Sequence, residues 1–112
     1  MTLFEKLISR QLRADIVYED ADVFAFRDIA PQAPIHILII PKRLIVRIGE
    51  AEPSDALLLG KLLLTASEIA RSQGLDEDGY RLVINNGRNA GEAVPHLHLH
   101  LLAGRKLTWP PG

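Results

Sequence analysis

Three histidines alternate with leucines near the end of the chain, in the segment His96-Leu97-His98-Leu99-His100-Leu101-Leu102. In a β-strand, successive side chains point to opposite faces, so this spacing predicts three imidazoles in one row and four leucines opposite. The chain has 4 histidines. Packing alone does not explain why three of them fall together, because like groups about 6.5–7 Å apart would repel one another if protonated. We expect one face of this strand to carry chemistry and the other to face the core.

The composition excludes several classes of protein. A chain of 112 residues is long enough for one domain with its own core, and we expect a single domain over residues 1–112. With no cysteine, the chain has no disulfides, thiolate metal ligands or Cys nucleophile, which is compatible with a cytoplasmic location. Its 13 basic and 14 acidic residues are interleaved, which argues against a nucleic-acid partner. No apolar run approaches the length of a membrane span, and we expect no membrane partner.

The N-terminal part of the chain contains signals for a short helix and three strands. Thr2 followed by Glu5 is a capping box, which predicts a short helix from about residue 3. Clusters of β-branched and aromatic residues on both sides of a tight turn predict a hairpin over residues 15–28. Residues 36–40 are predicted to form a strand that is buried on both faces and stopped by Pro41.

A long helix is predicted over residues 55–73, with Ser54 as its N-cap and Gly74 as the left-handed residue that ends it. One half of this helix carries the apolar residues expected in the core, namely Ala56, Leu58, Leu59, Leu62, Leu63, Ala66, Ile69 and Ala70. Leu57 and Leu64 lie on the other side, flanked by small residues. They are either two isolated surface leucines or a self-association surface; we expect the second, a homodimer through this helix.

Two further strands are predicted over residues 80–84 and 95–102. The sum is an α+β fold of about five antiparallel strands with helices packed on one side. The loop between the last two strands contains Asn85, Gly87 and Gly91, and such a loop can point several backbone N–H groups at an oxyanion. Because this loop leads into the histidine segment, we expect a phosphate-sized site there.

Two kinds of chemistry fit the histidines. A neutral imidazole held in one tautomer can attack phosphorus and form a phosphoramidate intermediate, while a neighbouring histidine protonates the leaving group. The same spacing can also bring imidazoles to a zinc ion. Glu92 is the only carboxylate near the segment, however. We therefore favour a phosphoryl reaction without a metal or other cofactor and keep zinc hydrolysis as the alternative.

Several segments closely resemble the histidine triad (HIT) superfamily and its nucleotide-binding HINT branch. Besides the histidine segment they are residues 4–8, 15–20, 25–29, 31–36, 40–42 and 109–112, so the similarity spans nearly the whole chain. The resemblance implies the dimeric HIT fold, with its long central helix and short N-terminal helix. It also implies hydrolysis of a purine nucleoside phosphoramidate to AMP or GMP and an amine, with no cofactor.

By the same resemblance, His98 is the nucleophile that attacks the α-phosphorus and carries the nucleotide until water releases it. His96 and His100 flank the phosphate and the leaving group. His36 completes the hydrogen-bonded histidine set that orients His98. These four residues form the catalytic group that the resemblance implies.

The resemblance also implies which residues bind the nucleotide. The phosphate and leaving-group contacts come from one side chain and three backbone amides, those of Asn85 and of Gly91, Ala93 and Val94. The Asp28 carboxylate accepts hydrogen bonds from both ribose hydroxyls. The base lies in an apolar pocket formed by Phe4, Leu7, Leu12, Phe26 and Ile29. For Leu7 and Leu12, a place in the core is the alternative.

Three positions depart from the HINT pattern. Ala93 stands where Ser or Thr is usual; the missing hydroxyl contact is worth about 1.5–3 kcal/mol, which slows turnover roughly ten- to over a hundredfold. Glu92 stands where Gln is common, and its charge is expected to weaken phosphate binding unless it points to solvent. Pro95 replaces an aromatic residue and predicts that the strand begins there or lies at an edge. We expect an active but slower enzyme; the alternative is a nucleotide-binding or scaffold protein with vestigial chemistry.

Overall fold

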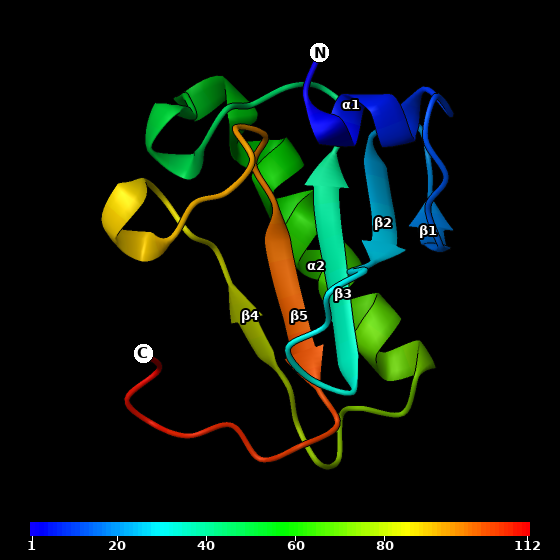
Figure 1. The fold of residues 1–112 in the computed structure, drawn as a ribbon, viewed down its shortest axis with the longest axis vertical. Coiled ribbons are helices and arrows are strands. Elements are labelled where there is room, and N and C mark those ends of the chain that lie inside the picture. The colour runs from blue at the N-terminus through cyan, green and yellow to red at the C-terminus, as the bar shows by residue number, and fades with distance from the viewer.

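The computed structural model describes residues 1–112 and contains one antiparallel five-stranded sheet (Figure 1). In chain order, its helices and strands are α1 (Leu3–Ile8), β1 (Ile16–Glu19), β2 (Val23–Arg27), β3 (Ile35–Pro41), α2 (Ala56–Ser72), β4 (Arg81–Val83) and β5 (Leu99–Ala103). The strands lie in the order β1-β2-β3-β5-β4. The predicted α+β fold is confirmed. Neither helix combines the length and the apolar character that a membrane span needs.

The two helices cover opposite faces of the sheet, not one face as predicted. On one face, α2 packs into a core that includes Ala25, Ile37, Ile39 and Leu99. On the other face, α1 packs against side chains of the same central strands in a second cluster, Phe4, Leu7, Phe24, Phe26, Leu38 and Ile40. Because β2 and β3 are apolar on both faces, each face needs a cover.

The elements predicted in the N-terminal part of the chain are present in the structure. The Thr2 hydroxyl accepts from the Glu5 amide (3.1 Å), and the Glu5 carboxylate accepts from the Thr2 amide (2.8 Å), which closes the capping box of α1. The turn between β1 and β2 is held by Asp20, whose carboxylate accepts from the amides of Asp22 and Val23, both at 2.8 Å. The capping box, the hairpin and β3 are therefore confirmed.

The long helix begins slightly later than predicted and buries a narrower stripe. A 3-10 turn precedes it, so Asp55 and not Ser54 is its N-cap. Gly74, at φ +71°, ends the helix as predicted. Ala56 and Leu63 are exposed, although they were placed on the predicted core face. The reason is that a sheet covers less than half the circumference of the helix that lies on it.

The last strand starts at Leu99, later than predicted. Pro95 has no N–H to donate, and the His96 amide turns back to the carbonyl two residues before it (2.8 Å). The Leu97 amide donates to the Ile45 carbonyl (2.7 Å), which belongs to a loop and not to a strand. Pro95, His96 and Leu97 therefore do not pair with a neighbouring strand.

His100 is thus the one member of the triad that lies in a strand, and the predicted row of three imidazoles does not form. Leu97, Leu99 and Leu101 are buried in the core under α2, as predicted. Leu102 is only half-buried and does not belong to that core. It is an even number of residues from His100, so it shares the face of β5 that carries this histidine.

Candidate active site

A cavity of about 430 Å³ lies between α1, the end of β2 and the histidine segment. Ten residues predicted from the sequence line it: Phe4, Leu7, Leu12, Phe26, Asp28, Ile29, Ala93, Val94, His98 and His100. Five others were not predicted, namely Leu3, Arg13, Ala14, Arg27 and Leu38. Of these, Leu38 carried a usable signal, because it shares a face of β3 with His36.

One end of the cavity is apolar. Phe4 and Phe26 meet edge to face there, with ring centroids 5.5 Å apart, and Leu7 is buried beside them. Leu12 and Ile29 form the rim and are 43% and 99% exposed. Leu7 therefore belongs to both the core and the cavity wall, whereas the core alternative for Leu12 is wrong.

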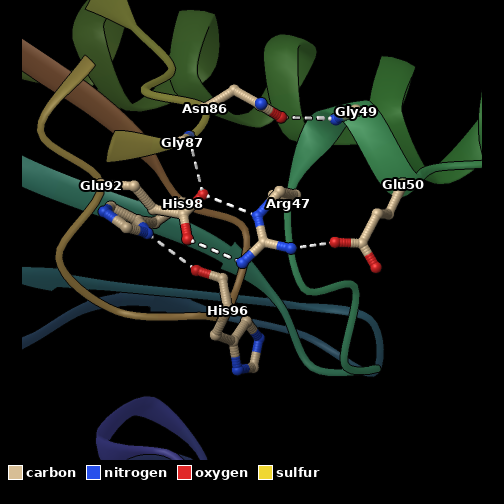
Figure 2. Close-up of polar contacts among 8 residues, drawn as sticks. All are labelled: Arg47, Gly49, Glu50, Asn86, Gly87, Glu92, His96 and His98. Atoms are coloured by element: carbon tan, nitrogen blue, oxygen red, sulfur yellow. Dashed lines mark hydrogen bonds and ion pairs between the residues drawn. The ribbon is translucent and has the colours of Figure 1, made fainter. Parts of the chain in front are cut away.

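His98 lies in the cavity wall with its ring fixed by one backbone hydrogen bond (Figure 2). Its Nδ1 lies 2.7 Å from the His96 carbonyl oxygen. A carbonyl oxygen only accepts, so Nδ1 carries the proton and Nε2 keeps a free lone pair. The rings of Phe4 and His100 pack against it, with centroids 5.1 and 5.0 Å away. His98 is thus held in the tautomer that leaves Nε2 able to attack an electrophile.

A chain of hydrogen bonds also fixes the tautomers of His36 and His100. The Gln32 amide donates to Nδ1 of His36 (3.1 Å), so His36 carries its proton on Nε2 and donates it to Nδ1 of His100 (2.9 Å). His100 must then carry its proton on Nε2, and this buried nitrogen has no partner in the chain. Burial, followed by repulsion from the neighbouring histidines, lowers the pKa of His100 to about 4. The cavity wall therefore holds a neutral imidazole with an unused N–H donor.

The ring of His96 points away from His98 (Figure 2). It is fully buried, its Nε2 donates to the Pro41 carbonyl (2.8 Å), and its Nδ1 lies 3.4 Å from the Thr2 hydroxyl. The ring does not line the cavity, although the sequence predicts it beside the phosphate. The alternation rule fails here because His96 precedes the strand. What His96 contributes to the site is the backbone carbonyl that orients His98.

Asp28 lies at the rim of the cavity, directly after β2. Its Oδ1 accepts from the Ala30 amide (2.8 Å), and its Oδ2 lies 3.5 Å from Nε2 of His36. Asp28, His36 and His100 form the one cluster of potential metal ligands, with ligand atoms within 4.8 Å of one another. The sequence predicted Glu92 as the one carboxylate near the histidine segment. In the structure, the carboxylate nearest the histidines is that of Asp28.

This cluster does not fit a zinc ion in its present arrangement. A zinc ligand must offer a lone pair, and the facing nitrogens of His36 and His100 share a proton across 2.9 Å. The other nitrogen of His36 already accepts from the Gln32 amide. A zinc ion would have to displace both hydrogen bonds.

The loop after β4 offers fewer amides to an anion than predicted. Gly87 and Gly91 adopt the left-handed region, at φ +86° and +83°, which shapes the loop. The Gly91 amide donates within the loop (3.1 Å), and neither Gly91 nor Asn85 lines the cavity. The amides of Ala93 and Val94 have no backbone or side-chain partner in the chain, and both residues line the cavity. These two N–H groups are the ones available to a phosphate.

Glu92, expected to repel a phosphate, is neutralised by Arg47. Its Oε1 accepts from Nε of Arg47 (2.9 Å) and its Oε2 from Nη2 (3.0 Å), while the Gly87 amide donates to Oε1 (3.0 Å). These contacts, led by the Arg47 hydrogen bonds, lower the pKa of Glu92 to about 2. Sequence analysis missed Arg47, because no local pattern connects residue 47 with residue 92.

Proteins with similar sequences share nearly the whole length of this chain. A protein of Synechococcus elongatus described as an uncharacterized HIT-like protein is 58% identical over 111 residues, covering 99% of this chain and 96% of that protein. A 14 kDa zinc-binding protein of Brassica juncea is 49% identical over 116 residues, covering 99% of each. The purine nucleoside phosphoramidase of Escherichia coli K12 is 49% identical over 106 residues, covering 95% of this chain and 89% of the enzyme.

Solved structures lead to the same conclusion. A HIT family hydrolase from Legionella pneumophila superposes with a TM-score of 0.98 at 48% identity, over 100% of both chains. The histidine triad nucleotide-binding protein from Candida albicans superposes with a TM-score of 0.83 at 31% identity, over 98% of this chain and 83% of that one. The HIT domain family matches residues 9–107. This chain therefore belongs to the HIT family and is similar to its HINT-like branch.

Proposed function

We propose that this protein hydrolyses purine nucleoside phosphoramidates to a nucleoside monophosphate, AMP or GMP, and an amine. The observation that carries the proposal is the free Nε2 lone pair of His98 in the wall of a cavity that Ala93 and Val94, whose amides have no partner, also line. A nucleophile next to free N–H donors suits attack on a phosphorus that develops negative charge. The similarity to HIT family hydrolases and to a phosphoramidase supports the same reaction.

In the proposed reaction, His98 Nε2 attacks phosphorus and the P–N bond of the substrate breaks. The Nε2–H of His100 donates a hydrogen bond to the departing nitrogen, which takes its proton from solvent and leaves as a neutral amine. Water then attacks the nucleotidyl-His98, the new N–P bond breaks, and the proton that the water loses returns to solvent. Over the cycle one P–N and one O–H bond break, one P–O and one N–H bond form, and His98 is restored.

In the bound substrate, we place the ribose at Asp28 and the purine at the apolar end formed by Phe4, Leu7 and Phe26. An adjacent pair of hydroxyl donors matches the two oxygens of one carboxylate. The cavity is large enough for a nucleotide, since ligand pockets are typically about 300–1,000 Å³. His36 acts through His100, and His96 acts through its carbonyl on His98.

A fluorogenic adenosine phosphoramidate tests the reaction. We expect His98→Asn to lower turnover by roughly three orders of magnitude or more, because the nucleophile is lost. Rapid acid quenching of the wild-type reaction is expected to trap the nucleotide on His98. Wild-type turnover no faster than that of His98→Asn would contradict hydrolysis.

A nucleotide-binding or scaffold function with vestigial chemistry is the second candidate. The observation that favours it is Ala93, a cavity residue without the hydroxyl that HINT-like proteins usually have there. In this case AMP binds to both wild type and His98→Asn, and neither turns over the phosphoramidate. The same assay, combined with calorimetric titration of AMP, separates the two functions.

The proposed reaction needs no metal and no other cofactor. The support is the proton between His36 and His100, which occupies the nitrogens that a zinc ion would need. We expect turnover to be unchanged after dialysis against a strong chelator. A loss of turnover that added zinc restores would show that a metal takes part.

We also propose that the protein forms a homodimer through α2, with one HIT domain per chain over residues 1–112, and works in the cytoplasm. Leu57 and Leu64 are 87% and 67% exposed on this helix. The same helix also borders an apolar groove, on a different side from these two leucines, lined by Ile48, Leu59, Leu62, Leu63, Ile84, Leu97 and Leu99. The absence of cysteine supports the reducing compartment. Light scattering at micromolar concentration is expected to give the mass of a dimer; a monomer mass would refute the assembly.

A further inference from the structure

Arg47 and Glu92 form a two-pronged ion pair beside the histidine segment (Figure 2). The remaining terminal nitrogen of Arg47 pairs with Glu50, and the Glu92 carboxylate also binds the Gly87 amide. The Glu92 amide donates to the Gly87 carbonyl as well (3.1 Å), so residues 87 and 92 are bonded twice. Two parallel N–H···O bonds fix a guanidinium and a carboxylate in one relative orientation. The pair therefore anchors the end of the loop to residue 47.

This ion pair is one of three ties between residues 45–49 and the chain that precedes His98. The Gly49 amide donates to the Asn86 side-chain oxygen (2.7 Å), and the Leu97 amide donates to the Ile45 carbonyl (2.7 Å). The other two ties are neutral hydrogen bonds. The ion pair is the tie that involves two charged side chains.

Ala93 and Val94 directly follow Glu92 and carry the two free amides of the cavity. No helix or strand includes them, so their position depends on the residues that anchor the chain on either side. We propose that the Arg47–Glu92 pair is a positioning element of the phosphate end of the cavity. It holds the two amides and His98 in place, and it cancels a negative charge that would repel the phosphate. This inference rests on the proposed nucleotide site.

The charges of the pair make its two effects separable. Removing Arg47 alone leaves the Glu92 carboxylate, only 11% exposed, without its cation near the phosphate end. Such a carboxylate repels an anionic ligand, and its segment is also free to move. Removing the charge of Glu92 as well abolishes the repulsion of the phosphate, but the segment that carries Ala93 and Val94 remains free to move. The double variant Arg47→Ala/Glu92→Gln should therefore recover part of the AMP affinity that Arg47→Ala alone loses.

The experiment compares Arg47→Ala with Arg47→Ala/Glu92→Gln by calorimetric titration of AMP and of adenosine. Adenosine reports on the apolar end and the ribose contact, and the ratio of the two affinities reports on the phosphate end. We expect Arg47→Ala to weaken AMP binding about tenfold or more while adenosine binding changes less than about twofold. The double variant is expected to regain roughly threefold in AMP affinity.

Lys61→Ala is the matched control, because it removes an exposed pair of contacts with Asp20 and Asp22 away from the cavity. It is expected to leave the AMP-to-adenosine ratio at the wild-type value. Equal losses for AMP and adenosine in Arg47→Ala, or a double variant no better than the single one, would overturn the inference. The binding ratio does not require turnover, so a wild-type protein that binds AMP but hydrolyses nothing would refute the proposed reaction and leave this inference to be decided by the ratio.

Discussion

The two ends of the cavity are built in different ways. The apolar end consists of side chains from α1, β2 and β3, such as Phe4, Phe26 and Leu38, which are packed into a buried cluster. The phosphate end consists of Ala93, Val94 and His98, none of which lies in a helix or strand. Hydrogen bonds and one ion pair hold that second segment in place.

This difference has an energetic consequence. Hydrophobic packing is not directional, so the apolar end contributes mainly to the stability of the fold. Hydrogen bonds are directional, and those around His98 decide which nitrogen carries a proton and where two amides lie. Substitutions at the apolar end should therefore lower stability, and substitutions at the phosphate end should lower activity with less effect on stability.

The largest effect is expected for Phe4→Ala. Phe4 is buried between Phe26 and the rings of His96 and His98, so its removal leaves a cavity in the second core. Such a loss costs about 3–5 kcal/mol of unfolding free energy. Urea denaturation measures it, and Leu12→Ala is the control, since Leu12 lines the same cavity but is exposed. Equal losses of stability in the two variants would contradict the distinction between core and rim.

The next effect is a loss of stability in acid that comes from His100, which lies in β5 with its ring against that of His98. The folded pKa of His100 is about 4, below about 6.5 in an unfolded chain. The unfolded state therefore binds more protons between these values, and the free energy of unfolding falls as the pH falls from about 6.5 toward 4. The contribution of His100 is on the order of 3 kcal/mol. Burial also lowers the pKa of His36 and His96, which adds to the loss with the same sign.

Urea denaturation at a series of pH values, with wild type and His100→Gln, checks this prediction. Gln keeps a polar side chain at the site and cannot titrate. The variant is expected to lose less stability than wild type between pH 6.5 and 4. Parallel stability curves would show that His100 binds its proton equally well in the folded and unfolded chain.

The parts of the fold that sequence predicted correctly depend on local signals. The capping box at Thr2, the Asp20 turn and the Gly74 stop each involve residues only a few positions apart. β3 follows from a run of apolar residues between prolines. The predicted start of β5 was wrong, because the Leu97 amide donates to the carbonyl of Ile45, far away in sequence. No local pattern predicts that contact.

In the candidate site, too, some features follow from patterns in the sequence and others depend on contacts between distant residues. Sequence placed His98, His100 and the apolar residues at one cavity, because the family pattern fixes them by position. It did not predict that the His96 ring turns away, nor that Arg47 neutralises Glu92. Both depend on contacts with the segment from residue 41 to 47, and such pairings across the fold leave no periodicity in a single sequence.

A smaller effect is expected where the two ends of the cavity meet, at Asp28. Asp28→Asn removes the charge from the contact that we propose Asp28 makes with the ribose. Such a contact is worth about 1.5–3 kcal/mol, so KM for an adenosine phosphoramidate should rise roughly ten- to a hundredfold. The 2′-deoxy substrate lacks one of the two hydroxyls and should be affected less. Steady-state kinetics with both substrates measure the difference. An identical rise in KM for the two would mean that Asp28 does not bind the ribose.

The smallest effect is a gain of activity at the phosphate end. Ala93→Ser restores a hydroxyl next to the two free amides, and we expect kcat for the phosphoramidate to rise about tenfold, since one hydrogen bond to a charged group is worth roughly 1.5–3 kcal/mol. Ala93 is exposed and lies in no helix or strand, so the unfolding free energy should stay within about 0.5 kcal/mol of wild type. A gain in kcat at constant stability would show that directional contacts at this end limit the rate. If kcat does not rise, the missing hydroxyl is not limiting, and the position of the amides, held by the Arg47–Glu92 pair, becomes the feature to vary next.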